Sequence, residues 1–333
     1  MNRSTSQIAT NAGTAAPFLA ARFIKEIGRG KKGARSMSRE DAQQLYEAML
    51  AGRVSDLEMG GILLAMRIKG ESVDEIAGFL TAAEAATDRL AMPPGALAPI
   101  VLPSYNGSRQ APNLTPLLAM LLARGGAPVL IHGVATDPGR VTTAEILLAM
   151  GFGPVRSHDD AARHFERGQP VFMPIDALSP RLARMLAMRS NLGVRNSAHT
   201  LVKILQPFEG PALRLTSYTH PEYLAMLSDY FSSAAPHERG DAFLMRGTEG
   251  ETVANAKRAQ QIEWFHGGER TILVERQAPV DDLPDLPEAS DAATTARWIE
   301  AALSGAQPVP QPIQDQARHC LRVAAEIRAR GQG

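Results

Sequence analysis

Positively charged side chains gather in a glycine-rich stretch near the N-terminus. Between Glu26 and Glu40 there is no acidic residue but five basic ones, Arg29, Lys31, Lys32, Arg35 and Arg39. Basic side chains on a glycine-spaced loop can follow a phosphate backbone, so this stretch indicates nucleic-acid contacts through its first four basic residues. A solvated loop also collects lysine and arginine without any such role, and the residues alone leave both explanations open.

A second basic feature lies in residues 179–205, whose pattern predicts a long helix. Arg195, His199 and Lys203 are spaced by four residues, so they would share one face of a continuous helix. From Arg181 to Arg214 the chain has six Lys or Arg residues and a single acid. The spacing predicts a second phosphate-binding stripe, and the alternative is an exposed helix face that happens to be basic.

Composition limits the classes of function. Of 333 residues, 44% are hydrophobic and 21% are charged, which is typical of a globular chain with a sizeable core. The formal net charge is zero, so any binding of nucleic acid must rely on local patches. The single Cys320 excludes an internal disulfide and a cysteine-rich metal site. No run of 18 apolar residues indicates a membrane span, and residues 1–16 are expected to form a disordered tail on a cytoplasmic protein.

The elements that must position these residues follow two patterns. Up to about Arg89 the periodicity is helical, with Ser38, Ser55 and Ser72 placed to cap three helices. Beyond a proline-rich break, short apolar runs alternate with helical stretches, which predicts βα units and a mostly parallel sheet. Trp264–Gly268 is expected to end a helix. The predicted parts are a small helical domain that dimerises, from 17–92 and 178–206, and an α/β domain from 97–177 and 207–330.

Several motifs make the chain similar to a known family. Arg53-Val54-Ser55-Asp56, then Gly61–Glu71, then Glu75–Phe79 resemble the N-terminal helices of anthranilate phosphoribosyltransferases and pyrimidine-nucleoside phosphorylases. Arg189–Arg195 resembles the family's Arg-x-x-Leu-Gly-x-Arg segment. The resemblance implies the anthranilate phosphoribosyltransferase-like fold, which is α/β with a small discontinuous α-helical domain.

The family's phosphate loop is altered in this chain. Its Gly-Thr-Gly-Gly-Asp sequence cradles pyrophosphate through backbone N–H groups, which requires glycine because a Cβ would block the approach. The corresponding segment here is Pro103–Gly107, where Pro103 has no N–H and Tyr105 adds a large ring. Ile131 replaces the lysine of the family's Lys-His-Gly-Asn-Arg element. The resemblance implies no catalytic residue and a degenerate substrate pocket of Ser104, Tyr105, Asn106, Gly107, Asn113, Thr115, His132 and Gly133.

The family's Asp-Glu pair for Mg²⁺ is altered as well. Glu251 matches the glutamate, whereas Gly250 stands at the aspartate position and Glu249 is one residue away. A carboxylate-held Mg²⁺ needs an octahedral shell that it shares with the substrate phosphate. The resemblance therefore implies that Glu249 and Glu251 are vestigial and that no cofactor is bound, with Mg²⁺ expected only in an active transferase.

One further departure resembles a subgroup of the family. Val202-Lys203 replaces the family's Gly-Pro break, as in the YbiB-type subgroup, which implies a homodimer that binds single- or double-stranded DNA or RNA through the phosphate backbone without selecting sequence. The alternative is a glycosyl or phosphoribosyl transferase with an altered substrate, for which Asn113, Thr115, His132 and Glu251 remain. A third possibility is a module that binds a small metabolite in the old pocket.

Overall fold

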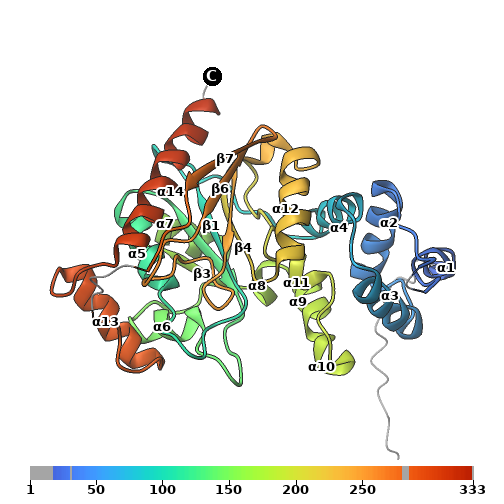
Figure 1. The fold of residues 1–333 in the computed structure, drawn as a ribbon, viewed down its shortest axis with the longest axis horizontal. Helices are drawn as coiled ribbons and strands as arrows, with labels where there is room; N and C mark the ends of the chain where they lie inside the picture. Colours follow the sequence, from blue (N-terminus) through green and yellow to red (C-terminus); the bar gives the residue numbers. More distant parts are fainter. Residues whose placement is uncertain (1–17, 31, 280–284, 332–333) are drawn as a thin grey trace, which may run out of the picture.

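The structure is a computed structural model that describes residues 18–30, 32–279 and 285–331. The expected tail, residues 1–16, lies outside the described residues, as does Lys31. Within them, no helix is both long and apolar enough to cross a membrane. Figure 1 shows α1–α4 at one end of the molecule, α13 at the other, and the sheet between them.

Four helices form the N-terminal part, and the expected serine caps are confirmed. Ser38, Ser55 and Ser72 each accept a hydrogen bond from the backbone N–H three residues further on, and capping boxes complete the last two. Gly78 allows α4 to approach α2, because a Cβ there would lie 2.2 Å from the carbonyl oxygen of Arg39. The helices are α1 (Ala21–Ile27), α2 (Arg39–Leu50), α3 (Asp56–Lys69) and α4 (Val73–Ala85).

The rest of the chain is built on one seven-stranded sheet with the order β3-β2-β1-β4-β5-β6-β7. The first five strands are parallel and the last two are antiparallel to their neighbours, so the predicted mostly parallel sheet is confirmed. The strands are β1 (Ile100–Ser104), β2 (Val129–Gly133), β3 (Val171–Pro174), β4 (Leu213–Tyr218), β5 (Ala242–Arg246), β6 (Ile262–His266) and β7 (Glu269–Val274). The strand order reverses between β1 and β4, and parallel sheets bind ligands beyond the carboxyl ends of strands at such a point.

Both faces of the sheet are covered. In β1, Ile100 and Leu102 belong to one hydrophobic cluster and Val101 to the other, as the alternation of side chains along a strand requires. The first cluster includes α5 (Thr115–Arg124), α6 (Thr143–Ala149), α13 (Ala292–Ser304) and α14 (Gln311–Arg330). The second includes α7 (His158–Glu166), α12 (Pro221–Ser233) and the N-terminal helices, so one continuous core joins the helical part to the sheet.

The long helix predicted for residues 179–205 is wrong. Gly193 ends the segment in the left-handed conformation, with φ of 70°, and the side chain of Asn196 then accepts the N–H of Ala198 and starts a new turn. Residues 179–205 form α9 (Pro180–Ala187), α10 (Arg189–Leu192) and α11 (Ala198–Leu201), and the short α8 (Ile175–Leu178) precedes them. α9 and α11 contact α2 and α4, respectively, so this returning segment packs on the N-terminal helices.

The expected helix end at Trp264–Gly268 is also wrong. Trp264 lies in β6, and Gly267 and Gly268, with φ of 56° and 83°, form the tight turn into β7. Two consecutive glycines between β-rich runs are the usual sequence of such a hairpin. A short 3₁₀ helix, η1 (His237–Arg239), precedes β5.

Candidate anion-binding site at the carboxyl edge of the sheet

A cavity of about 300 Å³ lies where the loop after β1 meets α9–α11. A neighbouring cavity of about 250 Å³ shares Arg195, His199 and Lys203 with it. Of the residues expected in the degenerate pocket, Tyr105 and Asn106 line the first cavity. The altered loop and the returning basic segment, which are far apart in the sequence, therefore lie at one place.

The backbone amides of the altered loop bind a carboxylate of the chain itself. Oε1 of Glu251 accepts the N–H of Asn106 at 2.9 Å and the N–H of Gly107 at 2.7 Å. Gly107 has φ of 62°, and a Cβ there would lie 2.7 Å from the carbonyl oxygen of Val141. Glu251 is 1% exposed, and burial raises the pKa of its carboxyl group. An internal anion thus occupies these two amide donors.

Glu249 caps the next part of the same loop. Its two oxygens accept the N–H groups of Arg109, Gln110 and Ala111 at 2.6, 2.9 and 2.8 Å. Glu249 has φ of 51°, the only positive φ of a non-glycine residue within the described parts of the chain. Such a conformation is costly for a residue with a Cβ, so the three hydrogen bonds hold the backbone in a strained turn.

The contacts of Glu249 and Glu251 show whether these two carboxylates could hold Mg²⁺. Both oxygens of Glu249 and Oε1 of Glu251 face backbone N–H groups, which repel a cation. Among the described residues no three His, Cys, Asp or Glu side chains converge as a metal site would require. Of the four oxygens only Oε2 of Glu251 has no hydrogen-bond partner among the described residues, and a single carboxylate oxygen is a poor fit for Mg²⁺.

Tyr105 turns toward the sheet and contacts His132. The Tyr105 hydroxyl and Nδ1 of His132 are 2.7 Å apart, and the two rings meet edge to face. Burial lowers the pKa of His132 to about 3, so this imidazole is neutral near pH 7. Gly133 follows at a close approach of two strands, because a Cβ there would lie 1.7 Å from the carbonyl oxygen of Ser104.

The other expected pocket residues form a buried hydrogen-bond network. Ser104 Oγ donates to Thr143 Oγ1 at 2.8 Å, and Asn113 Nδ2 donates to the same hydroxyl at 3.0 Å. Asn113 Oδ1 accepts the N–H of Thr115 at 3.1 Å, at the start of α5. These side chains hold α5 and α6 against β1 and do not line the cavity.

Arg195, His199 and Lys203 line one cavity, His199 and Lys203 from the short turn of helix around α11 and Arg195 from the loop before it. Arg195 donates to Asn106 Oδ1 at 3.1 Å, which joins the returning segment to the altered loop. Burial lowers the pKa of His199 to about 4 and that of Lys203 to about 8. His199 is therefore neutral near pH 7, so Arg195 and Lys203 carry the positive charge of this segment.

Positive charge comes from Arg195, which the sequence pattern singled out, and from three arginines that it did not predict to bind phosphate, Arg67, Arg140 and Arg189. Burial and the nearby Arg189, Arg140 and Arg67 lower the pKa of Arg195, so the four guanidinium groups share one electrostatic environment. They come from α3, α10 and two loops, which leaves no spacing to recognise. We call Arg67, Arg140, Arg189 and Arg195 the arginine cluster.

Few groups neutralise the arginine cluster. Arg67 donates to the Tyr223 hydroxyl at 3.2 Å and Arg140 to the carbonyl oxygen of Gly107 at 3.3 Å. Within the described parts of the chain, no carboxylate lies within 4 Å of any of the four guanidinium groups. The acids that line the two cavities are Glu71, Asp137 and Glu222.

The N-terminal basic loop lies elsewhere, between α1 and α2. Arg29 pairs with Glu26 at 2.6 Å, whereas Lys32 and Arg35 are not paired with an acid among the described residues. Lys31 is outside the described residues. Figure 1 places α1 at the outer end of the helical part, on the opposite side of α3 and α4 from the sheet.

Comparisons with known proteins agree with this architecture. A family model described as "Glycosyl transferase family, helical bundle domain" matches residues 21–86. The chain is 30% identical over 300 residues to anthranilate phosphoribosyltransferase of Rhodopseudomonas palustris, covering 89% of this chain and 85% of that one. It resembles the crystal structure of anthranilate phosphoribosyltransferase from Thermus thermophilus with a TM-score of 0.70 at 20% identity, covering 93% and 90% of the two chains.

The chain belongs to the anthranilate phosphoribosyltransferase-like family. It is also 47% identical over 306 residues to the uncharacterized protein YbiB of Escherichia coli K12, covering 92% of this chain and 94% of that one. The resemblance drawn from the motifs, to the family and to the YbiB-type sequence within it, is confirmed.

Proposed function

We propose that this chain binds nucleic acid in the cytoplasm through the phosphate backbone, without selecting sequence. The observation that carries the proposal is the arginine cluster, four guanidinium groups with no carboxylate within 4 Å among the described residues. Like charges held together repel one another, and a polyanion that binds between them removes that repulsion and releases its own counterions.

The shape of the site suits single nucleotides of a strand. The two cavities that meet at Arg195 have volumes of about 300 and 250 Å³ and carry Tyr105 in one and Tyr223 in the other. Aromatic rings beside a cationic groove are the usual platform for bases of a single strand. His199 lies between the two cavities and is neutral near pH 7, so it adds a flat ring rather than charge.

We propose that the chain acts as a homodimer through its helical part. Leu57, Leu64 and Ile68 on α3 are 88%, 47% and 63% exposed, and their spacing puts them on one helix face. An apolar groove of about 310 Å³ beside that face lies between α1 and α3. A two-fold axis through α3 would bring two copies of the site into one assembly and lengthen the surface open to nucleic acid.

The transferase alternative has less support. Glu251 fills two amide donors of the loop that would hold pyrophosphate, and Asn113, Thr115 and His132 are committed to buried contacts. Calorimetry with phosphoribosyl pyrophosphate and Mg²⁺ tests it. Heat that saturates at one site per chain would favour the transferase.

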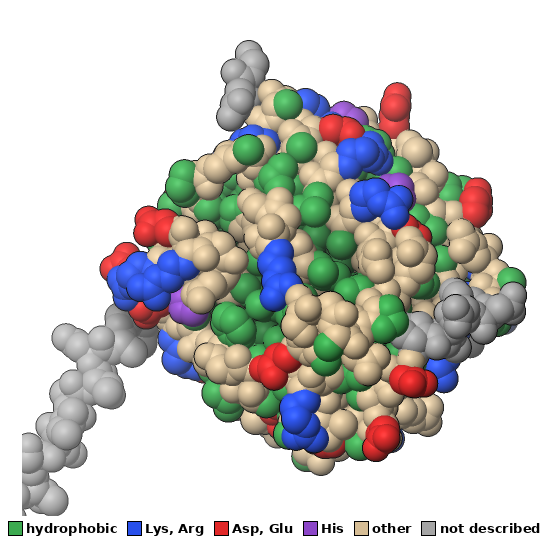
Figure 2. Space-filling view, turned by 90° about the vertical axis from the view of Figure 1, so that its left-hand side faces the viewer, with side chains coloured by type: hydrophobic (Ala, Val, Ile, Leu, Met, Phe, Trp, Pro, Cys, Tyr) green, Lys and Arg blue, Asp and Glu red, His purple; other side chains and the backbone are tan. Residues whose placement is uncertain are grey.

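The direct test is fluorescence anisotropy with a labelled single strand of DNA, the matching duplex and the same strand as RNA. We expect binding to all three, with an affinity that falls steeply between about 50 and about 200 mM salt, because phosphate contacts release counterions. The control is Arg297→Ala on α13, at the end of the molecule opposite the N-terminal helices. Figure 2 shows the molecule from this end, where basic and acidic side chains are scattered over the surface. Absence of binding at the lowest salt would contradict the proposal.

A further inference from the structure

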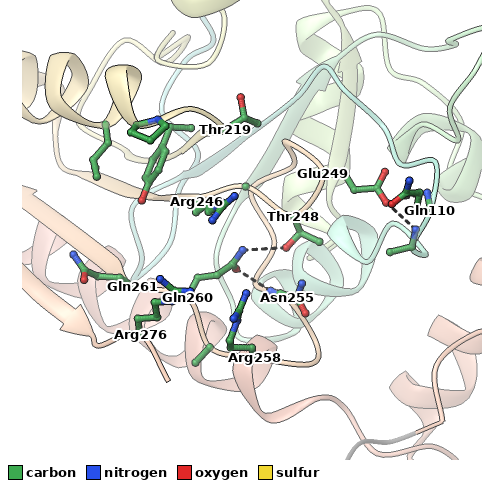
Figure 3. A pocket seen from close by; sticks show the side chains of 16 residues that line it. Gln110, Thr219, Arg246, Thr248, Glu249, Asn255, Arg258, Gln260, Gln261 and Arg276 are labelled. Carbon is green, nitrogen blue, oxygen red and sulfur yellow. Dashed lines mark hydrogen bonds between the residues drawn. The ribbon is translucent and has the colours of Figure 1, made fainter. Parts of the chain in front are cut away.

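A cavity of about 620 Å³ has no residue in common with the cavity at Arg189, and it shares Tyr218 and Thr219 with the neighbouring cavity of about 250 Å³. It lies beyond the carboxyl ends of β4 and β5, where Tyr218 and Arg246 end their strands. The loop from β5 to β6 forms its floor, and its size suits a ligand as large as a nucleotide. Figure 3 shows three arginines from separate segments around it, Arg246, Arg258 and Arg276.

Within the described parts of the chain, these three guanidinium groups have no partner of opposite charge. Among the described residues, none of them lies within 4 Å of a carboxylate, and none makes a side-chain hydrogen bond. Among the described residues that line the cavity the one acid is Glu249, whose two oxygens already accept three backbone N–H groups. The cavity therefore has a surplus of positive charge.

The loop that carries Arg258 is held in place. Oε1 of Gln260 accepts the N–H of Asn255 at 2.9 Å, and its Nε2 lies 3.5 Å from the Thr248 hydroxyl (Figure 3). The Thr248 hydroxyl in turn donates to the carbonyl oxygen of Val253 at 2.9 Å. The backbone that carries Arg258 is thus fixed by a hydrogen-bond network, which lowers the entropy lost when Arg258 binds a ligand.

We propose that this cavity binds a small phosphorylated molecule, with its phosphate groups on Arg246, Arg258 and Arg276. Guanidinium groups form paired, charge-assisted hydrogen bonds with phosphate oxygens. A terminal phosphate or diphosphate concentrates about two negative charges in one place, whereas a strand carries one on each nucleotide. Pro221, Leu224 and Ala259 supply an apolar side for the organic part of the ligand.

The three arginines of this cavity are not members of the arginine cluster, so variants of each set keep the two binding proposals apart. The full chain is titrated by calorimetry with adenosine diphosphate, ribose 5-phosphate and inorganic pyrophosphate, without metal. At least one probe is expected to bind with a dissociation constant below about 1 mM. The double variant Arg258→Gln/Arg276→Gln should weaken that binding by about tenfold or more, because two charge-assisted contacts are lost.

A matched variant and a DNA strand used as a second probe distinguish a small phosphorylated ligand from the phosphodiester backbone of nucleic acid. Arg189→Gln, in the other cavity, should leave the probe affinity within about twofold of the wild type. Three results would overturn the proposal: no probe binds up to about 10 mM, the double variant binds as the wild type does, or Arg189→Gln weakens the probe equally. If no small probe binds the protein but the double variant weakens binding to a DNA strand, the cavity binds phosphodiesters instead, and this result would also overturn the proposal.

Discussion

Two regions side by side at the edge of the sheet treat negative charge in opposite ways. The loop after β1 directs backbone N–H groups outward, and Glu251 and Glu249 occupy five of them. The arginine cluster lies next to that loop and has no carboxylate within 4 Å among the described residues. The loop after β1, which we call the closed side, already binds carboxylates of the chain itself. The arginine cluster, which we call the open side, has no such partner among the described residues.

The difference explains how a transferase scaffold could exchange one anionic ligand for another. Backbone N–H groups are fixed in direction, so one carboxylate of the chain can satisfy neighbouring N–H groups and exclude an external anion from them. Arginine side chains are long, reach into solvent and can each meet a different phosphate. The loop after β1 therefore stabilises the fold, while the arginine cluster is the region that we propose binds nucleic acid.

Glu251→Ala should give the largest effect, on the closed side. The change leaves the buried N–H groups of Asn106 and Gly107 without an acceptor and should lower the free energy of unfolding by about 3 kcal/mol. Urea denaturation measures it. Glu249→Ala is the matched variant, expected to cost about 1 kcal/mol because water can reach the amides of this partly exposed turn.

The same variant shows whether the closed loop is an anion site at all. Inorganic pyrophosphate added to Glu251→Ala should restore part of the lost stability, since a bound anion stabilises the folded state. The wild type should show no such gain from this loop. Equal stability of the two proteins would mean that Glu251 does not close it.

On the open side, Arg189→Ala/Arg195→Ala should weaken binding to a DNA strand by about 2 kcal/mol, or roughly thirtyfold. The slope of log affinity against log salt should also fall by about two, because two phosphate contacts disappear. Lys203→Ala should have less effect than Arg195→Ala, since Lys203 is half-buried with a pKa of about 8 whereas Arg195 is exposed. A greater loss for Lys203→Ala would place the phosphate contact on the returning segment itself.

Acid should lower the free energy of unfolding through His132, which contacts Tyr105 of the loop after β1. An unfolded histidine takes up its proton near pH 6.5, whereas the folded one, with a pKa of about 3, does not. Its contribution to stability is therefore complete above pH 6.5 and is lost as the pH falls toward 3. His132→Gln should reduce the slope of unfolding free energy between about pH 6.5 and about pH 4 by about 1 kcal/mol per pH unit. Parallel slopes for the two proteins would contradict a buried neutral His132.

The N-terminal basic loop should give the smallest effect. Lys32→Ala and Arg35→Ala each remove a charge that lines neither cavity of the arginine site and should weaken strand binding by about twofold at low salt. Arg29→Ala should change it less, because Arg29 is already paired with Glu26. Anisotropy titrations at one salt concentration rank the three. A loss comparable to that of Arg189→Ala/Arg195→Ala would move the binding surface to the helical end.

Local patterns predicted the elements but not the site. Ser38, Ser55 and Ser72 indicated their helices correctly because a cap and its helix are neighbours in sequence. The break at Gly193 was missed, since a glycine inside a helical pattern ends a helix only where tertiary contacts favour a positive φ.

The contacts that define the site join residues far apart in the chain. Glu251 reaches Asn106 across 145 positions, and the arginine cluster spans four segments from Arg67 to Arg195. The motif comparison did find the altered loop and the carboxylates near it. The motifs did not predict that these carboxylates accept the N–H groups of the altered loop. A glutamate that binds a metal and a glutamate that binds backbone N–H groups look the same in a sequence.

A crystal structure of the protein with a short DNA strand tests the central claim most directly. We predict phosphate oxygens within hydrogen-bond distance of Arg189 and Arg195, with Glu251 still bonded to the N–H groups of Asn106 and Gly107. A phosphate on those two N–H groups, with Glu251 displaced, would contradict it.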